Sequence, residues 1–160
     1  MYSLYLVRDL VDEDFLLLES DLIYEQRALT TAISFARDNC LLLSGLTHSG
    51  DEVFVVLHAG RLSHMSKNPA ELGEINGELV GITKISTGLF SQMLSTAEKL
   101  FEYDLRKDYE TDCLVETARR YPVYGCLVPD LVWAEIDDAD HLERARDLIY
   151  PRISRGNTGP

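Results

Sequence analysis

The stretch Trp133-Ala134-Glu135-Ile136-Asp137-Asp138 precedes a helical pattern over residues 139–149. Its apolar and polar residues alternate, which is the pattern of a strand whose side chains point to opposite faces in turn. The apolar face suits a core, and Trp133, Glu135 and Asp137 share the other face. Two carboxylates this close together can hold Mg²⁺ when a third group and a substrate phosphate complete its shell. We therefore predict a strand here that leads into a metal site.

A further carboxylate, Asp21, lies far away in the sequence but in a similar setting. It follows the run Phe15-Leu16-Leu17-Leu18-Glu19-Ser20, which is apolar enough for a buried strand. In α/β sheets, ligands collect at the carboxyl ends of strands. Asp21, Glu135 and Asp137 are therefore the candidate Mg²⁺ ligands. The spacing alone leaves other roles open, because an aspartate before a helix often accepts the free N–H groups of its first turn, and Glu135 could face solvent.

Three segments, in order, resemble motifs of the Rossmann-like nucleotidyltransferases. Residues 14–25 resemble the metal-binding strand of these enzymes, residues 77–86 their substrate-side strand, and residues 133–145 their closing metal motif and the helix after it. The resemblance covers residues 3–153. It is greatest to the small cytidylyltransferases that activate phosphocholine, aminoethylphosphonate or related phosphates, and weaker to the sugar-1-phosphate nucleotidyltransferases.

The resemblance implies a reaction and its site. A phosphate or phosphonate substrate would attack an NTP, expected to be CTP, and release pyrophosphate, with Mg²⁺ held by Asp21, Glu135 and Asp137. Lys67 matches a position where these enzymes often carry a lysine near the substrate phosphate, and it is the candidate catalytic residue. Gly81, in the substrate-side strand, is a candidate substrate-binding residue. Without the resemblance, Lys67 would be read as a surface lysine.

One feature of the family has no match. These enzymes carry a glycine-rich loop with an arginine and a lysine that hold the triphosphate, whereas this chain opens on Met1-Tyr2-Ser3-Leu4-Tyr5, which is typical of a helix. We therefore expect the C-terminal part of such an enzyme, truncated before its nucleotide-binding strands and loop and inactive alone. Uncovered sheet edges and apolar surface are usually hidden by pairing with another chain, so a homodimer is expected. The alternative is a non-catalytic remnant that binds itself or a partner.

Aromatic residues and acids gather between residues 103 and 133. Aromatic rings beside carboxylates can hold the ammonium group of a choline or aminoalkyl phosphate. The candidate substrate-binding side chains of this region are Tyr109, Glu110, Asp112 and Trp133. The same predicted aromatic box includes Tyr103, Tyr121 and Tyr124. The alternative is that these tyrosines pack the core of a small α/β domain.

Composition narrows the function classes. The 160 residues are 46% hydrophobic and 26% charged, which is ordinary for a soluble globular protein. A formal net charge of −12 argues against binding nucleic acid or an anionic membrane, both of which need basic surface. No apolar run approaches the ~20 residues that span a bilayer, and the N-terminus has no signal-peptide pattern. An odd number of widely spaced cysteines fits reduced thiols, so we expect a cytoplasmic protein.

Helical and strand patterns alternate along the chain. Helices are predicted over residues 3–11, 25–37, 89–101, 109–120 and 138–149, and strands over residues 15–20, 39–44, 52–58, 62–67, 78–86, 122–128 and 131–136. Hairpin and crossover connections together predict an α/β fold with a mixed β-sheet flanked by helices. Residues 1–153 would form a single domain, and residues 154–160, which lack hydrophobic content, a disordered tail.

Overall fold

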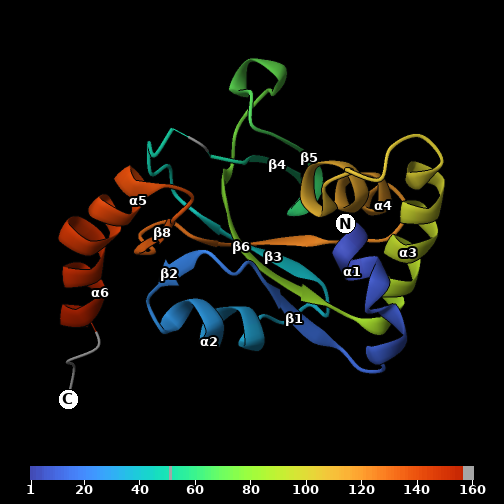
Figure 1. The fold of residues 1–160 in the computed structure, drawn as a ribbon, viewed down its shortest axis with the longest axis horizontal. Helices are drawn as coiled ribbons and strands as arrows, with labels where there is room; N and C mark the ends of the chain where they lie inside the picture. The colour runs from blue at the N-terminus through green and yellow to red at the C-terminus, as the bar shows by residue number, and fades with distance from the viewer. Residues whose placement is uncertain (51, 157–160) are drawn as a thin grey trace.

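The computed structural model describes residues 1–50 and 52–156. Among these residues, the larger of two sheets is six-stranded, with the order β1 (Phe15–Leu18), β6 (Gly77–Ile85), β3 (Cys40–Ser44), β7 (Tyr124–Val128), β5 (Arg61–Ser66) and β4 (Phe54–His58) (Figure 1). β3 and β7 pair in parallel, whereas β6 pairs antiparallel with both of its main neighbours, so the predicted mixed sheet is confirmed. The smaller sheet pairs β2 (Leu22–Tyr24) with β8 (Trp133–Glu135).

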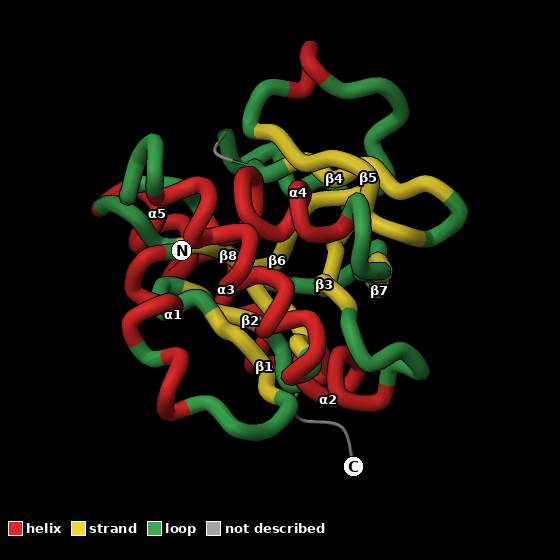
Figure 2. The backbone as a smooth tube through the Cα atoms, turned by 90° about the vertical axis from the view of Figure 1, so that its right-hand side faces the viewer, coloured by secondary structure: helices red, strands yellow, loops and turns green. Residues whose placement is uncertain are grey.

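Helices cover both faces of the main sheet. α2 (Arg27–Ser34) packs on one face, and α3 (Thr87–Phe101), the π-helical segment η3 (Tyr109–Leu114) and α4 (Val115–Ala118) pack on the other. α1 (Tyr2–Leu6) contacts α3 and is followed by a 3-10 turn (Arg8–Leu10). α5 (Ala139–Arg144), the π-helical segment η4 (Ala145–Ile149) and α6 (Tyr150–Gly156) form one end of the molecule in Figure 1. Figure 2 shows the β4–β5 hairpin, and the loop with the 3-10 turn Pro69–Glu71, projecting from the sheet.

The strand β3 shows why this sequence needs helices on both sides of the sheet. All of its residues are buried, which is expected of an apolar run with layers above and below. Leu41 and Leu43 pack with α3 and α4, while Cys40 and Leu42 pack with α2. None of the helices in residues 1–50 and 52–156 is long and apolar enough to cross a membrane.

The last helical region is longer than predicted. It runs past residue 149 to Gly156, so residues 154–156 of the predicted tail are helical. The side chain of Ile153 is buried, and it anchors these last turns to the rest of the molecule. Residues 157–160 of the predicted tail lie outside the described residues.

The strand that carries Glu135 differs from its prediction in two respects. It is short, and it pairs with β2, a strand that the sequence pattern did not predict. Both of its faces are also covered, since Trp133 is 8% and Ala134 is 2% exposed. The Trp133 ring packs with core residues of α2 and β3, and its Nε1 donates to Ser44 Oγ at 2.8 Å. The predicted open face is therefore wrong at Trp133, whereas Glu135 remains half-buried.

A buried carboxylate in β6 couples stability to pH. Glu78 is 0% exposed, its Oε1 accepts the Thr47 N–H at 2.7 Å, and its Oε2 is buried without a hydrogen-bond partner. Burial raises the pKa of Glu78, although the Thr47 hydrogen bond opposes this. A carboxyl group with a raised pKa in the folded state favours folding while protonated, and this contribution is lost as the pH rises from the unfolded pKa through the folded one.

We therefore expect the free energy of unfolding to fall less steeply with rising pH in Glu78→Gln than in the wild type, at pH values above the ordinary 4.5. Urea denaturation at a series of pH values measures this slope. Some slope should remain, because burial also raises the pKa of Glu19 and of Glu110. Glu74→Gln makes the same charge change at an exposed position and should behave like the wild type. Equal slopes for wild type and Glu78→Gln would contradict a raised pKa at Glu78.

Candidate functional site

Three carboxylates converge where β1 leads into β2. Glu19, Asp21 and Glu135 each present an oxygen within 4.8 Å of the others. Glu19 and Asp21 lie between the two strands, and Glu135 ends β8. The pairing of β2 with β8 places Leu22 opposite Glu135, and the Ile136 N–H donates to the Asp21 carbonyl at 2.9 Å. Main-chain hydrogen bonds thus bring together acids that are far apart in the sequence.

The proximity of these acids is unfavourable unless a cation offsets it. The three side chains are half-buried, and Oδ1 of Asp21 is buried without a hydrogen-bond partner. Burial raises the pKa of Glu19, and the charges of Asp21 and Asp137 raise it further. A hard divalent cation prefers oxygen ligands of this kind, and it would give the Asp21 oxygen a partner. The residues present therefore fit Mg²⁺.

Gly81 and Tyr109 hold the Glu19 carboxylate in place. The Glu19 N–H donates to the Gly81 carbonyl at 3.0 Å, and Gly81 has a φ of 75°. A Cβ atom at Gly81 would lie 2.7 Å from Cδ of Glu19, so a larger residue would displace this side chain. On the other side, the Tyr109 hydroxyl donates to Glu19 Oε1 at 2.6 Å. Burial raises the pKa of Tyr109 well above its ordinary value, so its hydroxyl stays protonated and remains a donor.

A small cavity of about 40 Å³ adjoins the carboxylates. Its wall includes Lys67, which follows β5, Glu110 of η3, Trp133 of β8 and Arg144 of α5. Burial raises the pKa of Glu110, and the charge of Glu19 adds to this effect while that of Lys67 opposes it. A single water needs ~10–15 Å³ of such space, so the cavity can hold a few waters or part of a hydrated ion, and not a nucleotide.

Asp137 lies outside the three-carboxylate cluster, which contains Glu19, although its charge raises the pKa of Glu19. The Asp137 side chain is 51% exposed, and its Oδ2 lies 4.0 Å from Nδ1 of His141. The chain leaves the strand after Glu135 and enters α5, where Oδ1 of Asp138 caps the helix by accepting the His141 N–H at 2.8 Å. The alternation that predicted a shared face for Glu135 and Asp137 therefore ends with the strand.

Glu19 was not predicted, although the sequence carries a signal for it. Glu19 lies two residues before Asp21, the same spacing as Glu135 and Asp137. In an extended segment, residues two apart point the same way. The apolar run before Glu19 indicated a strand that continues through Glu19 to Ser20. Asp21, the first acid after that strand, was therefore chosen in place of Glu19.

The other predicted residues divide into those at the site and one away from it. At the site are Lys67, Gly81, Tyr109, Glu110 and Trp133. Asp112 is away from it: its carboxylate accepts hydrogen bonds from Nζ of Lys107 at 3.2 Å and from the N–H of Asp108 at 3.0 Å. These bonds fix the start of η3, which is a structural task.

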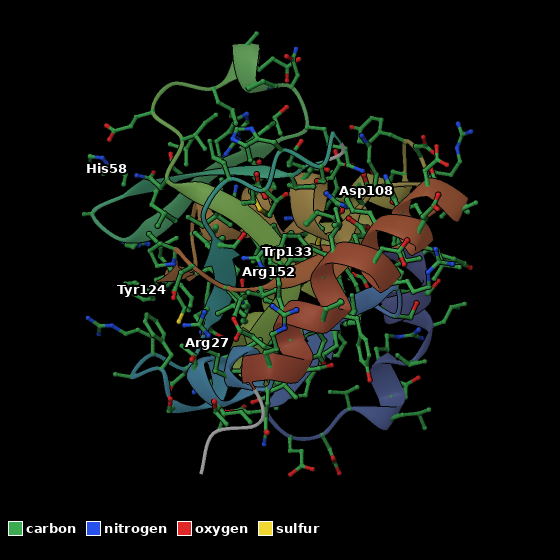
Figure 3. All side chains as sticks on the ribbon, turned by 90° about the vertical axis from the view of Figure 1, so that its left-hand side faces the viewer. Arg27, His58, Asp108, Tyr124, Trp133 and Arg152 are labelled. Carbon is green, nitrogen blue, oxygen red and sulfur yellow. The ribbon has the colours of Figure 1, made fainter. Side chains whose placement is uncertain are left out.

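The predicted aromatic box does not form. Tyr103 is 85% exposed. Tyr121 packs on the α3 side of the main sheet, and Tyr124 packs on the α2 side, where its ring centroid lies 4.7 Å from Cζ of Arg37. Figure 3 shows Tyr124 well apart from Trp133. An ammonium group needs rings within about 6 Å, so any aromatic contribution at the site comes from Tyr109 and Trp133.

The Tyr109 hydroxyl provides a direct test of how Glu19 is held. We expect Tyr109→Phe to weaken Mn²⁺ binding about three- to tenfold, because the loss of a hydrogen bond to a charged group costs on the order of 1 kcal/mol or more. Calorimetric titration with Mn²⁺ measures the change. Tyr103→Phe removes a hydroxyl from an exposed ring and should leave the affinity unchanged. Equal affinities for the Tyr109→Phe variant and the wild type would show that Glu19 needs no support from this hydroxyl.

No family model matches this chain. Solved structures of nucleotidyltransferases do resemble it. The inositol-1-phosphate CTP transferase from T. maritima aligns with a TM-score of 0.73 and 19% identity, over 99% of this chain and 62% of that one. A protein assigned as a glucose-1-phosphate thymidylyltransferase from Bacillus anthracis aligns with a TM-score of 0.65 and 15% identity, over 92% of this chain and 59% of that one. The CTP:phosphocholine cytidylyltransferase from Streptococcus pneumoniae aligns with a TM-score of 0.63 and 12% identity, over 92% of this chain and 62% of that one.

The chain therefore has the fold of these nucleotidyltransferases, which confirms the resemblance found in its three sequence segments. It spans between 59% and 62% of the length of the three proteins. At identities of 12–19% the similarity establishes the fold. The reaction must be argued from the side chains of the site.

Proposed function

We propose that this chain forms the metal-binding and acceptor-binding part of a nucleotidyltransferase. The observation that carries the proposal is the convergence of Glu19, Asp21 and Glu135 beside a cavity lined by Lys67. A phosphate or phosphonate oxygen of the acceptor would attack the α-phosphorus of an NTP, for which we propose CTP. A new P–O bond forms at the α-phosphorus, its bond to the bridging oxygen of the β-phosphate breaks, and pyrophosphate leaves.

Each residue of the proposed site would have a separate role. The three carboxylates would hold Mg²⁺, which when bound neutralises charge on the reacting phosphate oxygens. Lys67 would attract the acceptor phosphate as a point charge. Glu110 and Trp133 line the small cavity, which would admit only one end of the acceptor, and Glu110 suits a cationic group there. The proposed acceptor is therefore an aminoalkyl or choline phosphate, or the matching phosphonate, in preference to a sugar phosphate.

Turnover needs groups beyond this site. Backbone N–H groups and a lysine of a glycine-rich loop cradle the β- and γ-phosphates in related phosphoryl transfers. No segment of the sequence has that pattern. We therefore propose that this chain by itself binds metal and acceptor but releases pyrophosphate only at a background rate. A non-catalytic partner-binding domain is the competing proposal, and it requires neither metal nor acceptor binding.

The oligomeric state and the cellular compartment of this chain are also proposals. Exposed apolar side chains such as Leu6, Leu10 and Ile33 favour self-association, and we propose a homodimer. The three cysteines are free and buried, which supports a reducing compartment, the cytoplasm.

Acceptor binding tests the proposed function. Calorimetric titration with phosphocholine or aminoethylphosphonate in the presence of Mg²⁺ should show saturable binding, tighter than that of glucose-1-phosphate. Lys67→Gln should weaken it about tenfold, since it removes the charge that faces the phosphate. Lys99→Gln makes the same change on the exposed side of α3 and should have no effect. Absence of acceptor binding in Mg²⁺, or an unaffected Lys67→Gln, would favour the non-catalytic alternative.

A further inference from the structure

A second and larger cavity, of about 270 Å³, lies between two loops and the last helices. Residues 45–47 and 129–132 form its loop walls, and Arg144 and Arg152 reach it from the α5–α6 region. Trp133 lines it too, and Figure 3, which looks onto this end of the molecule, shows Trp133 and Arg152 close together. This cavity adjoins the smaller one beside the carboxylates, because Trp133 and Arg144 line both.

The two arginines at this cavity have no acidic partner among the described residues. Among the ion pairs of residues 1–50 and 52–156, Arg146 of the same helical region pairs with Asp147 at 2.6 Å and with Glu143 at 3.6 Å. Neither Arg144 nor Arg152 forms such a pair in this part of the chain, and Nε of Arg144 is buried without a hydrogen-bond partner. Two guanidinium groups without a carboxylate partner among the described residues therefore line one cavity, and the buried Nε–H of Arg144 can donate to an acceptor that enters it.

The carboxylate of Asp130, in the wall of this cavity, does not neutralise the two arginines. Asp130 lines the cavity, but its carboxylate oxygens accept hydrogen bonds from NH1 of Arg27 at 3.2 and 3.3 Å. The hydrogen bonds from Arg27 lower the pKa of Asp130, so it stays ionised and engaged with Arg27. Asp130 therefore pairs with Arg27 and not with Arg144 or Arg152, although Arg144 also lines the smaller cavity beside Glu19, Glu110 and Glu135.

We propose that this cavity binds a small phosphate-bearing anion, a diphosphate or a compact phosphate ester, through Arg144 and Arg152. The planar guanidinium fork matches phosphate oxygens in two-pronged hydrogen bonds, and a buried N–H without an acceptor is costly. The volume is slightly below the ~300–1,000 Å³ of ordinary ligand pockets, which suits an anion of this size. None of the three carboxylates lines this cavity, although it adjoins theirs, and the proposal does not depend on the proposed transferase reaction.

Binding is tested with inorganic pyrophosphate and inorganic phosphate, titrated in EDTA so that no divalent cation contributes. Calorimetry on the full chain should show one saturable site, with pyrophosphate bound more tightly than phosphate. Arg152→Gln should weaken pyrophosphate at least tenfold, and because Arg152 is exposed the variant should fold normally, as circular dichroism would show. Arg144→Gln should weaken it similarly. The matched control is Arg120→Gln, which changes an exposed arginine just after α4, and Figure 1 shows α4 and α6 on opposite sides of the molecule.

Trp133, the single tryptophan of the chain, lines both cavities, so its fluorescence reports binding at either, and the Arg152→Gln variant assigns the binding to the larger one, which Arg152 lines. Pyrophosphate should change the fluorescence emission of Trp133 with the same midpoint as the calorimetric titration. The proposal is overturned if pyrophosphate gives neither heat nor an increase in melting temperature, or if Arg152→Gln and Arg120→Gln bind it equally. Since the titration contains no divalent cation, these outcomes would not contradict the proposed metal and acceptor site. Failure of acceptor binding in Mg²⁺ would likewise not contradict anion binding in this cavity.

Discussion

Glu135→Gln is expected to weaken Mn²⁺ binding by about 100-fold or more, because one of three charged ligands becomes a neutral amide. Asp21→Asn should have a similar effect, since its buried Oδ1 has no other partner within the described residues. Mn²⁺ serves as the probe because carboxylate sites of this kind accept it in place of Mg²⁺. Calorimetry gives the affinity, and the electron paramagnetic resonance signal of free Mn²⁺ gives the number of bound ions.

The same substitutions should stabilise the metal-free protein. Three carboxylates with oxygens within 4.8 Å repel one another at neutral pH, and an amide at Glu135 removes one of the charges. The melting temperature in EDTA should therefore be higher in the Glu135→Gln variant than in the wild type. Added Mn²⁺ should raise the melting temperature of the wild type alone, because a ligand stabilises only a folded state that binds it. A variant that gains stability while losing the metal has not lost it by misfolding.

Two further variants separate the cluster from its surroundings. Asp137→Asn should bind Mn²⁺ within about threefold of the wild type, because a side chain that does not coordinate the ion acts on it only through its charge. Asp112→Asn should also keep its affinity but lose stability, since Asp112 accepts hydrogen bonds from Lys107 and Asp108. If Asp137→Asn weakened Mn²⁺ as much as Glu135→Gln does, the ligand set predicted from the sequence would be the correct one.

The fold was predictable where a local pattern reflects burial. β3 lies between two helical layers, so its apolar run marks it in the sequence. β2 is different, because it spans three residues and exists as a strand through its pairing with β8. No local periodicity encodes a contact between segments so far apart. The extension of the last helix to Gly156 likewise depends on the packing of Ile153 against the rest of the molecule.

The carboxylates of the candidate site were also predictable only in part. Asp21 and Glu135 were predicted because ligands collect at the carboxyl ends of strands in α/β sheets, and because the sequence around them resembles the metal-binding motifs of the nucleotidyltransferases. Asp137 was grouped with them because alternation was continued beyond the strand, into a segment that begins a helix. Glu19 was missed because its role depends on two distant contacts, with Gly81 and with Tyr109. Such contacts between β6, η3 and the β1–β2 turn arise only once the sheet and its helices are assembled.

Gly81→Ala is expected both to destabilise the protein and to impair the metal site. A residue with a Cβ atom in the left-handed region costs roughly 1–2 kcal/mol, and Gly81 has a φ of 75°. The new Cβ would also lie 2.7 Å from Cδ of Glu19. β1 and β3 flank β6 on either side and restrain its backbone, so the Glu19 carboxylate must move. We expect a further loss of about 1–2 kcal/mol from this clash and at least tenfold weaker Mn²⁺ binding.

Gly60→Ala separates the two effects. Gly60 has a φ of 77° in the turn between β4 and β5, and a Cβ atom there would meet nothing within 4 Å. This variant should therefore show the backbone strain alone, with a loss of about 1 kcal/mol and wild-type Mn²⁺ affinity. Urea denaturation and calorimetric titration of both variants give the comparison. If Gly81→Ala lost no more stability than Gly60→Ala and bound Mn²⁺ as the wild type does, then Gly81 would serve backbone conformation only, and Glu19 would not be a metal ligand. A larger loss of affinity in Gly81→Ala alone would tie the glycine in β6 to the carboxylate that it leaves room for.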